Sequence, residues 1–345
     1  MVTINDIAKA AKVSTATVSR VLNNDKKMSV STETRERILD ISTKLGYVPI
    51  RKRKSPRIIQ TMKKNIGILM YCSQQYEWED TYFMSIRKGI EKECNRKGLS
   101  IRKIIHLGDL GDGEMDDDNE LRELDGVIFV GGPDKHEERE LYELFGSYIV
   151  YVNNLSNSGE YDNVGIDYSY ATHHALNYLF SLGHKQIGYI GGIEHRGQSG
   201  PEIANPRKIA FEETMVEHNL YNPSFVHLSK GFLINDGYES MKNVLKKEVV
   251  PTAFFIASDA MAIGAIRAIH EAGLNVPTDI SIVSFNDIDV AQYTQPSLTT
   301  VRVYTEEMGK YAVNMLLDRF EEREIPVNVL FPSKLIVRES AVKLK

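Results

Sequence analysis

Twenty residues near the N-terminus, INDIAKAAKVSTATVSRVLN at 4–23, carry the apolar spacing of two short helices joined by a tight turn. Thr3 and Asp6 form a capping-box pattern that would start the first helix, and Ser14 can cap the second. The second helix is otherwise short and polar and carries Arg20 near its end. We therefore expect a small helical head with a recognition helix that fits a DNA major groove. The apolar positions of this predicted head are Ile4, Ile7, Ala8, Ala11, Val13, Val18, Val21 and Leu22.

The charge of the chain supports this interpretation over a plain helical hairpin, which has no connection with nucleic acid. Residues 1–64 hold 15 Lys and Arg against 5 Asp and Glu, whereas the remaining 281 residues hold 27 against 42. A chain that is acidic overall thus keeps its positive charge at one end, as expected where phosphates are neutralised.

A third helix is predicted from Ser31, its cap, to Gly46, its stop signal. We assign residues 1–47 to the DNA-binding head. The next segment, 48–64, has two prolines, many basic residues and little periodicity. It is either a hinge that lies close to DNA or a disordered, solvated tether.

From residue 65 to 345 short apolar runs alternate with helical stretches, as in parallel sheets built from strand–helix–strand units. About ten strands is too many for one open sheet at this spacing, so we predict two α/β subdomains that share a cleft. The predicted strands are NIGILM, SIRKII, GVIFV, IVYV, NVGI, QIGYI, AFFIA, ISIVSF, TTVRV and KLIVR.

The candidate segments for catalysis, metal binding or cofactor binding lack the residues or the spacing that such motifs require. HEERE at 136–140 lacks the second histidine of a zinc-protease helix, and IGYIGG at 187–192 has the wrong spacing for a dinucleotide turn. We therefore expect no enzyme activity, no cofactor and no metal. Without a membrane-spanning run or a secretion signal, the expected location is cytoplasmic, with Cys72 and Cys94 as reduced packing residues.

Polar residues gather where predicted strands end, and ligands of such folds bind beyond these carboxyl ends. Amides and carboxylates there, with Arg207 at the head of a helix, suit a neutral polyhydroxylated ligand. Trp78, Tyr82 and Phe83 offer aromatic faces on which a sugar ring can stack. Each strand-end residue alone is equally a helix cap. These residues are Asn153, Asn154, Asp167, Ser258, Asp259, Asn286 and Asp287.

Several long segments of the chain resemble the LacI/GalR family of transcriptional regulators. They are the predicted recognition segment at 4–23, VSTETRERILDISTKLGY at 30–47, the block at 251–287 and QPSLTTVRV at 295–303. Three further segments, YFMSIRKGIEKEC, RAIHEAGLNVPTDIS and FPSKLIVRES, are most similar to repressors of galactose and β-galactoside operons.

The resemblance implies an N-terminal helix-turn-helix head followed by a periplasmic-binding-protein-like core, in a homodimer that binds double-stranded operator DNA and a sugar effector. It also implies site residues. Base contacts fall to Thr15, Ala16 and Arg20, and phosphate contacts to Ser14, Thr17, Ser19 and Asn23. Apart from the resemblance, the basic charge of the hinge makes Arg51 and Arg53 candidates for further DNA contacts. The effector contacts are Arg207, Ser258, Asp259, Asn286 and Asp287, together with Asn153, Tyr82 and Phe83. The rival within this class is a carbon-catabolite regulator controlled by a phosphocarrier protein.

Three features depart from the family pattern. The usual hinge carries a leucine that wedges into the minor groove, and here IRKRKSPRIIQTM stands instead, so either Ile58, Ile59 or Met62 replaces the wedge or the hinge binds phosphate. Asn286 stands where several sugar-binding relatives have Asp. The chain ends at Lys345 without the leucine heptads that make some relatives tetramers.

Overall fold

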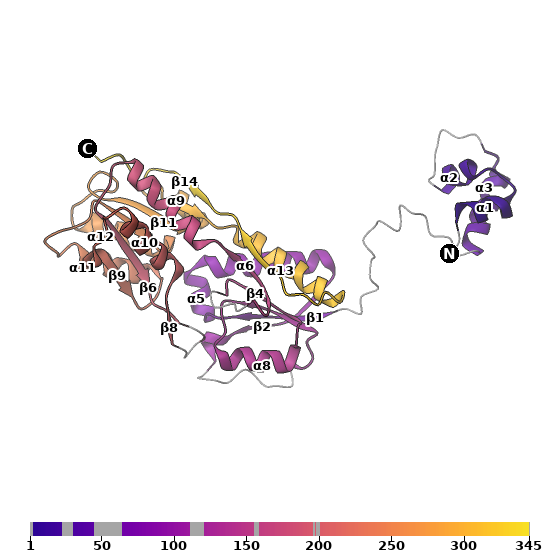
Figure 1. The fold of residues 1–345 in the computed structure, drawn as a ribbon, viewed down its shortest axis with the longest axis horizontal. Coiled ribbons are helices and arrows are strands. Elements are labelled where there is room, and N and C mark those ends of the chain that lie inside the picture. The colour runs from indigo at the N-terminus through magenta and orange to yellow at the C-terminus, as the bar shows by residue number, and fades with distance from the viewer. Residues whose placement is uncertain are drawn as a thin grey trace. The chain divides into compact units, whose positions relative to one another are not determined.

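The computed structural model describes residues 3–22, 30–44, 64–110, 121–154, 159–195, 197 and 201–344. It separates the chain into two compact units, 1–62 and 63–345 (Figure 1).

The described residues of the first unit form three helices, as the sequence predicts: α1 (Ile4–Ala11), α2 (Thr15–Leu22) and α3 (Thr32–Lys44). The predicted capping box is present, because the Thr3 amide donates to Asp6 Oδ2 at 2.8 Å and the Asp6 amide donates to Thr3 Oγ1 at 3.4 Å. Ser14 caps α2 by accepting from the Thr17 amide at 3.1 Å. These caps fix where α1 and α2 begin.

A small apolar core joins the three helices. Lys12 adopts a left-handed conformation (φ 54°) that ends α1 and turns the chain toward α2. The buried side chains of this core are Ile7, Ala8, Ala11, Val18, Val21 and Ile38. The apolar faces predicted from the sequence therefore pack against one another, and the polar face of α2 points to solvent.

The second unit contains two six-stranded sheets, one in each of two lobes. The first sheet has the order β13-β5-β4-β3-β1-β2, and the second has the order β14-β12-β11-β10-β6-β9. All neighbouring strands are parallel except β12 and β14. The first sheet comprises β1 (Asn65–Met70), β2 (Ser100–His106), β3 (Gly126–Val130), β4 (Ile149–Val152), β5 (Asp162–Ile166) and β13 (Asn328–Phe331). The second comprises β6 (Ile187–Gly192), β9 (Val226–Ser229), β10 (Ala253–Ile256), β11 (Ser281–Asn286), β12 (Thr299–Arg302) and β14 (Lys334–Ile336).

Every strand that the sequence predicts is present, so the two-subdomain α/β prediction is confirmed. Three features were not predicted: β9, the edge strand β13, and a short antiparallel hairpin of β7 (Glu194–His195) and β8 (Glu202–Ile203).

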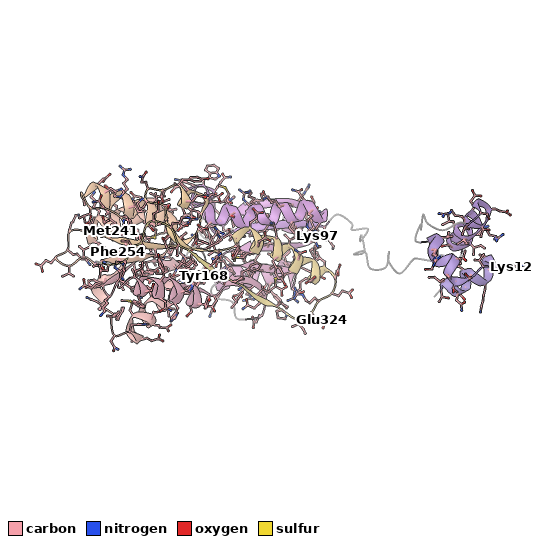
Figure 2. All side chains as sticks on the ribbon, turned by 90° about the horizontal axis from the view of Figure 1, so that it is seen from above. Lys12, Lys97, Tyr168, Met241, Phe254 and Glu324 are labelled. Atoms are coloured by element: carbon pink, nitrogen blue, oxygen red, sulfur yellow. The ribbon has the colours of Figure 1, made fainter. Side chains whose placement is uncertain are left out.

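Helices cover both faces of each sheet. In the first lobe α6 and α13 lie on one face and α8 on the other; in the second, α9 and α10 lie opposite α11 and α12. Met241 and Phe254 are among the fully buried side chains between these layers (Figure 2). The helices are α5 (Gln74–Glu79), α6 (Thr81–Lys97), α8 (Lys135–Phe145), α9 (Tyr168–Ser181), α10 (Pro206–Glu217), α11 (Ile234–Val244), α12 (Asp259–Glu271) and α13 (Thr305–Phe320). Single 3₁₀ turns lie at Leu107–Asp109, Pro223–Phe225 and Asp289–Gln292.

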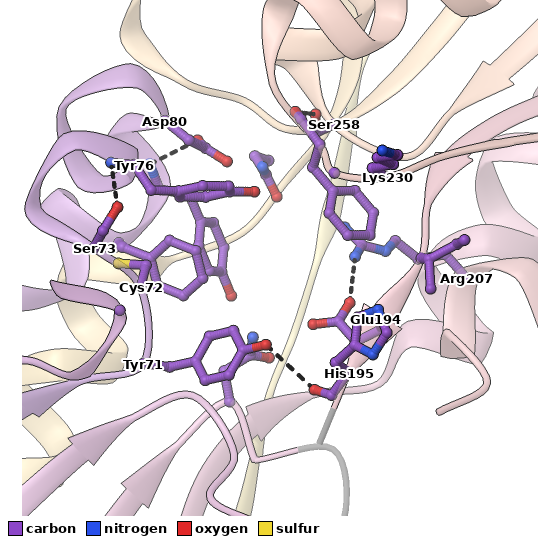
Figure 3. A pocket seen from close by; sticks show the side chains of 18 of the residues that line it. Tyr71, Cys72, Ser73, Tyr76, Asp80, Glu194, His195, Arg207, Lys230 and Ser258 are labelled. Atoms are coloured by element: carbon purple, nitrogen blue, oxygen red, sulfur yellow. Dashed lines mark hydrogen bonds and ion pairs between the residues drawn. The ribbon is translucent and has the colours of Figure 1, made fainter. Parts of the chain in front are cut away.

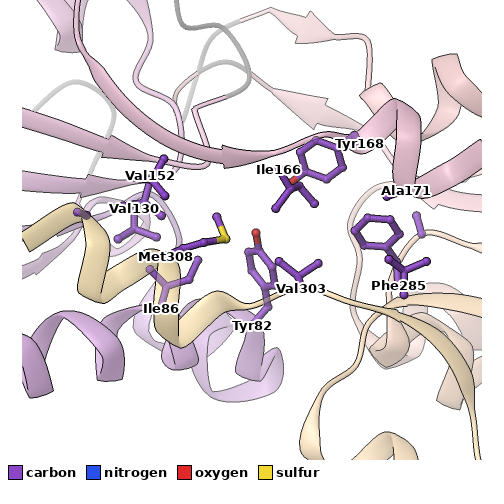
Figure 4. Close-up of a cluster of buried hydrophobic side chains, with 14 of the residues drawn as sticks. Tyr82, Ile86, Val130, Val152, Ile166, Tyr168, Ala171, Phe285, Val303 and Met308 are labelled. Carbon is purple, nitrogen blue, oxygen red and sulfur yellow. The ribbon is translucent and has the colours of Figure 1, made fainter. Parts of the chain in front are cut away.

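The chain crosses between the lobes three times. It passes from β5 to α9, returns from β12 to α13, and leaves again from β13 to β14. The first lobe therefore takes α13 and β13 from the C-terminal part of the chain. One cluster of buried side chains runs through both lobes at these crossings, with Val130 and Met308 at one end and Phe285 at the other (Figure 4).

Glycines allow the helices of one pair to approach closely in each lobe. A Cβ on Gly89 of α6 would lie 2.1 Å from the Glu306 carbonyl oxygen, and one on Gly309 of α13 would lie 2.2 Å from that of Ile86. A Cβ on Gly237 of α11 would likewise clash with the backbone of α12. Side chains at these positions would push the paired helices apart.

Candidate functional site

A cavity of about 280 Å³ lies between the two lobes, at the carboxyl ends of their strands (Figure 3). This is near the lower end of the ~300–1,000 Å³ that small-molecule sites usually enclose. Tyr71, Tyr76 and Asp80 line it from the first lobe, while Arg207, Phe232 and other residues line it from the second. The cavity thus lies at the strand ends, where the sequence predicts a ligand site.

Six of the eight predicted effector residues line this cavity. They come from segments far apart in the chain: α6 supplies two, the end of β4 one, α10 one, and the ends of β10 and β11 one each. The six are Tyr82, Phe83, Asn153, Arg207, Ser258 and Asn286. Trp78 is 61% exposed and does not line the cavity.

Asp259 and Asp287, the other two predicted contacts, are engaged elsewhere. Asp259 is fully buried and accepts hydrogen bonds from the hydroxyls of Ser284 and Thr300 and from the Ile288 amide. Burial raises its pKa to about 7, although these three donors favour the ionised form. Asp287 pairs with Arg302 at 2.6 Å and with Arg338 at 2.7 Å. Neither residue lines the cavity, because each follows the strand-end residue that does.

Arg207 is held firmly at the second lobe's side of the cavity. Its Nη1 donates to the Ala257 carbonyl at 2.7 Å, and its Nε donates to Asn205 Oδ1 at 3.1 Å. The guanidinium also lies 5.0 Å from the ring centre of Phe232 and 5.4 Å from that of Tyr168. The guanidinium, whose side chain is 11% exposed, is thereby held in a fixed position at the wall of the cavity.

Two asparagines enter the cavity from equivalent strand ends with strained backbones. Asn153 follows β4 with φ 65°, and Asn286 ends β11 with φ 115°. Such conformations are rare for residues other than glycine and cluster at binding sites. Tyr168 donates to Asn153 Oδ1 at 2.5 Å, which orients that amide toward the cavity.

The cavity lining also includes carboxylate and ammonium groups that the sequence did not indicate, on Asp80, Glu194 and Lys230. Burial raises the pKa of Asp80, against the opposing effects of the Tyr82 amide and the Arg207 charge. Burial likewise raises the pKa of Cys72 to about 12, so this thiol stays protonated at neutral pH. With two potential anions and two cations, the lining carries no excess charge of either sign.

Glu194 was not predicted because the end of β6 was placed too early in the sequence. The apolar run QIGYI suggests a strand that ends at Ile190, whereas β6 continues through two glycines to Gly192. The same strand-end rule, applied at the true boundary, would have selected Glu194.

In the head, the predicted base-contacting residues lie on one exposed helix. Thr15 and Ala16 occupy the first turn of α2 and Arg20 its last turn, and all three are exposed. Ser14 is also exposed, and Thr17 and Ser19 are half-buried. Asn23, Arg51 and Arg53, and with them almost all of the predicted hinge, fall outside the described residues.

Among the residues that the structure describes, no group of three or more His, Cys, Asp or Glu side chains is arranged to hold a metal ion. Within the same residues, no helix has the length and apolar character needed to cross a membrane.

Comparisons with known proteins agree with this architecture. Residues 3–49 match the family described as bacterial regulatory proteins, lacI family, and residues 176–341 match a periplasmic binding protein-like domain. The chain is 43% identical over 345 residues to the HTH-type transcriptional repressor MelR of Bacillus subtilis (strain 168), covering 99% of this chain and 97% of that protein. It is 36% identical to the HTH-type transcriptional regulator GalR of Lacticaseibacillus casei, over 99% and 100% of the two chains.

Solved structures share the fold. The lac repressor dimer bound to operator and the anti-inducer ONPF has a TM-score of 0.69 at 23% identity, with 99% of each chain covered. The complex of the transcriptional regulator CelR with cellobiose has a TM-score of 0.69 at 24% identity, over 99% and 100% of the two chains.

Proposed function

The chain belongs to the LacI/GalR family of transcriptional regulators, and on that premise we propose that its operator affinity is controlled by galactose or a β-galactoside. It is a DNA-binding transcriptional repressor with a helix-turn-helix head and a sugar-binding type of core.

The observation that carries the effector proposal is the convergence of polar side chains in one cavity. Arg207 donates, Asn153 and Asn286 both donate and accept, and Ser258 lies beside them, while Tyr82 and Phe83 supply aromatic surface. A sugar needs this combination, because its hydroxyls require paired donors and acceptors and its ring has an apolar face. A galactose-type sugar is further supported by the relative named GalR.

On the DNA side we assign base contacts to Thr15, Ala16 and Arg20, which are exposed on α2. An arginine can hydrogen-bond two acceptors of guanine in the major groove. Ser14, Thr17, Ser19, Asn23, Arg51 and Arg53 are assigned to the phosphates. The protein acts as a cytoplasmic homodimer, since paired heads read the two halves of a pseudo-palindromic operator.

The switch has two states of the core. The sugar binds one state more tightly, by a few kcal/mol, and operator DNA prefers the other, because a ligand with equal affinity for both states shifts nothing. The coupling is reciprocal, so operator DNA weakens sugar binding by the same factor by which sugar weakens operator binding.

Titration calorimetry on the full-length protein tests the effector, with galactose, lactose and melibiose set against glucose and ribose. We expect a galactose-containing sugar to bind, to raise the melting temperature by mass action, and to lower operator affinity. Arg207→Met should abolish sugar binding while operator binding persists. Arg267→Met removes an arginine that is exposed on α12, and it serves as the matched control.

Two results would overturn the proposal. One is the absence of binding by every saccharide, combined with an operator affinity that responds to a phosphocarrier protein; this identifies the carbon-catabolite type of regulator. The other is a sugar affinity that operator DNA leaves unchanged, which removes the coupling.

A further inference from the structure

The β7–β8 hairpin places a carboxylate in the cavity. It follows directly from β6, and its strands pair Glu194 with Ile203 and His195 with Glu202. Glu194 lines the cavity next to Arg207, whereas Glu202 is exposed on the neighbouring strand (Figure 3). The two acids of one hairpin thus differ in whether they can reach a ligand.

A single buried amide positions both Glu194 and Arg207. Asn205 is 2% exposed, and its Nδ2 donates to Glu194 Oε2 at 2.9 Å. Its Oδ1 accepts from the backbone amide of Arg207 at 3.0 Å and from Arg207 Nε at 3.1 Å. The carboxylate and the guanidinium are therefore fixed relative to each other before a ligand arrives.

Each of the two charged groups keeps one hydrogen-bonding atom unused. Arg207 Nη2 lies 3.8 Å from Glu194 Oε2, which is an ion-pair distance but too long for a hydrogen bond. Within the described part of the chain, neither Arg207 Nη2 nor Glu194 Oε1 has a hydrogen-bond partner. A strong donor and a strong acceptor thus stand side by side at the wall of the cavity.

This pairing suits two neighbouring hydroxyls of a neutral saccharide. One hydroxyl can donate to the carboxylate while the next accepts from the guanidinium, and both bonds are charge-assisted. An anionic ligand group would meet the negative charges of Glu194 and Asp80, and a cationic group would meet Arg207 and Lys230. The lining therefore favours an uncharged diol over a sugar phosphate or an amino sugar.

The hairpin is also hydrogen-bonded to the first lobe. Tyr71, just after β1, donates from its hydroxyl to the His195 carbonyl at 3.4 Å, and the Gly197 amide donates to the Gly132 carbonyl at 3.3 Å. Glu194 thus belongs to the second lobe by sequence but is held in place from both lobes.

We propose that Glu194 is a specificity-determining residue of the effector site, which reads two adjacent hydroxyls of a neutral saccharide together with Arg207. The inference rests on the proposed sugar-binding function and adds to it a residue that strand-end reasoning did not select. Asn205 is the positioning residue that sets the spacing of the two groups.

Glu194→Gln tests this assignment in the full-length protein, with Glu202→Gln from the same hairpin as the matched control. Glutamine keeps the shape of the side chain and can still accept from Asn205, so a cooperative melt is expected. Calorimetry with the binding sugar, and then with its monodeoxy derivatives one by one, measures the dissociation constants. The rise in melting temperature on adding the sugar provides a second readout.

We expect Glu194→Gln to weaken sugar binding roughly tenfold or more, because a charge-assisted acceptor becomes a neutral one. At least one monodeoxy derivative should bind the wild type and Glu194→Gln equally well, since it lacks the hydroxyl that Glu194 reads. Glu202→Gln should bind all these sugars like the wild type.

An unchanged affinity in Glu194→Gln would overturn the proposal. So would an equal loss for the parent sugar and every monodeoxy derivative, which would mean that Glu194 acts only by holding Arg207. Both results leave the sugar-binding function intact. If the wild type binds no saccharide at all, the proposed function fails instead, so the two failures can be told apart.

Discussion

Arg319 donates from Nε to Asp162 Oδ2 at 2.8 Å, and this buried pair joins α13 to β5 across 157 residues of sequence. Burial alone would raise the pKa of Asp162, but hydrogen bonds from Arg323, Arg319 and the Val327 amide hold it below its ordinary value. The pair therefore anchors α13 and β13, the C-terminal elements of the first lobe, to the first sheet.

Arg319→Met should lower the free energy of unfolding of this unit by roughly 3 kcal/mol, because a buried carboxylate loses one of its two counter-charges. Urea denaturation followed by circular dichroism measures the loss. Arg267→Met, which removes an exposed pair with Glu271, should leave the stability close to that of the wild type, because solvent screens such a pair. Equal losses in the two variants would contradict the assigned role of Arg319.

Arg20→Ala should weaken binding to the cognate operator by ~1–3 kcal/mol if Arg20 makes a paired contact to a base. Its exposed position in the last turn of α2 gives the side chain access to a groove. Fluorescence anisotropy against operator and against random DNA of equal length separates the two roles. The same loss on both DNAs would make Arg20 a phosphate contact only.

Replacing Arg51 and Arg53 together by glutamine should reduce the slope of log affinity against log salt by about 2, since each phosphate contact releases close to one counterion. Operator affinity measured over a series of salt concentrations gives the slope. If the slope stays the same, this basic segment is a tether that does not touch the phosphates.

Glu306 should contribute to stability above pH 4.5 and lose that contribution as the pH falls. Hydrogen bonds from Lys92 and Lys310 lower its pKa from 4.5 to about 2, so the folded protein binds the proton more weakly than the unfolded chain does. Because the Glu306 side chain is 29% exposed, we expect the gain to be screened to about 1 kcal/mol.

Urea denaturation of the wild type and Glu306→Gln at pH 7 and pH 3 measures this effect. The variant should be less stable at pH 7, and the difference should narrow at pH 3. A difference that is independent of pH would show that the ion pairs of Glu306 contribute nothing to stability.

The long elements of this fold could be predicted from the sequence because their apolar periodicity is strong. The two-residue strands of the β7–β8 hairpin are too short to show alternation, and β9 (VHLS) and β13 (NVLF) are edge strands whose side chains are only partly buried. β9 and β13 are each four residues long and include polar residues, so their apolar runs are too short to indicate a strand.

The site was predictable to the level of the strand end and no further. Ser258 and Asn286 reach the cavity, yet their neighbours Asp259 and Asp287 turn to partners around the sheet edge. Side chains of successive residues diverge by an angle that depends on the local backbone, and Asn286 has φ 115° there. Sequence pattern does not contain that angle.

The order of the crossings between lobes has a consequence for the nascent chain on the ribosome. The first lobe lacks its covering helix α13 and its edge strand β13 until residue 331 has emerged, by which point most of the second lobe has already been synthesised. The first lobe, although its first strand is made earlier, therefore receives its last elements only near the end of translation. The two lobes acquire their full set of helices and strands at about the same time. Any premature stop codon before that point leaves both without their final form.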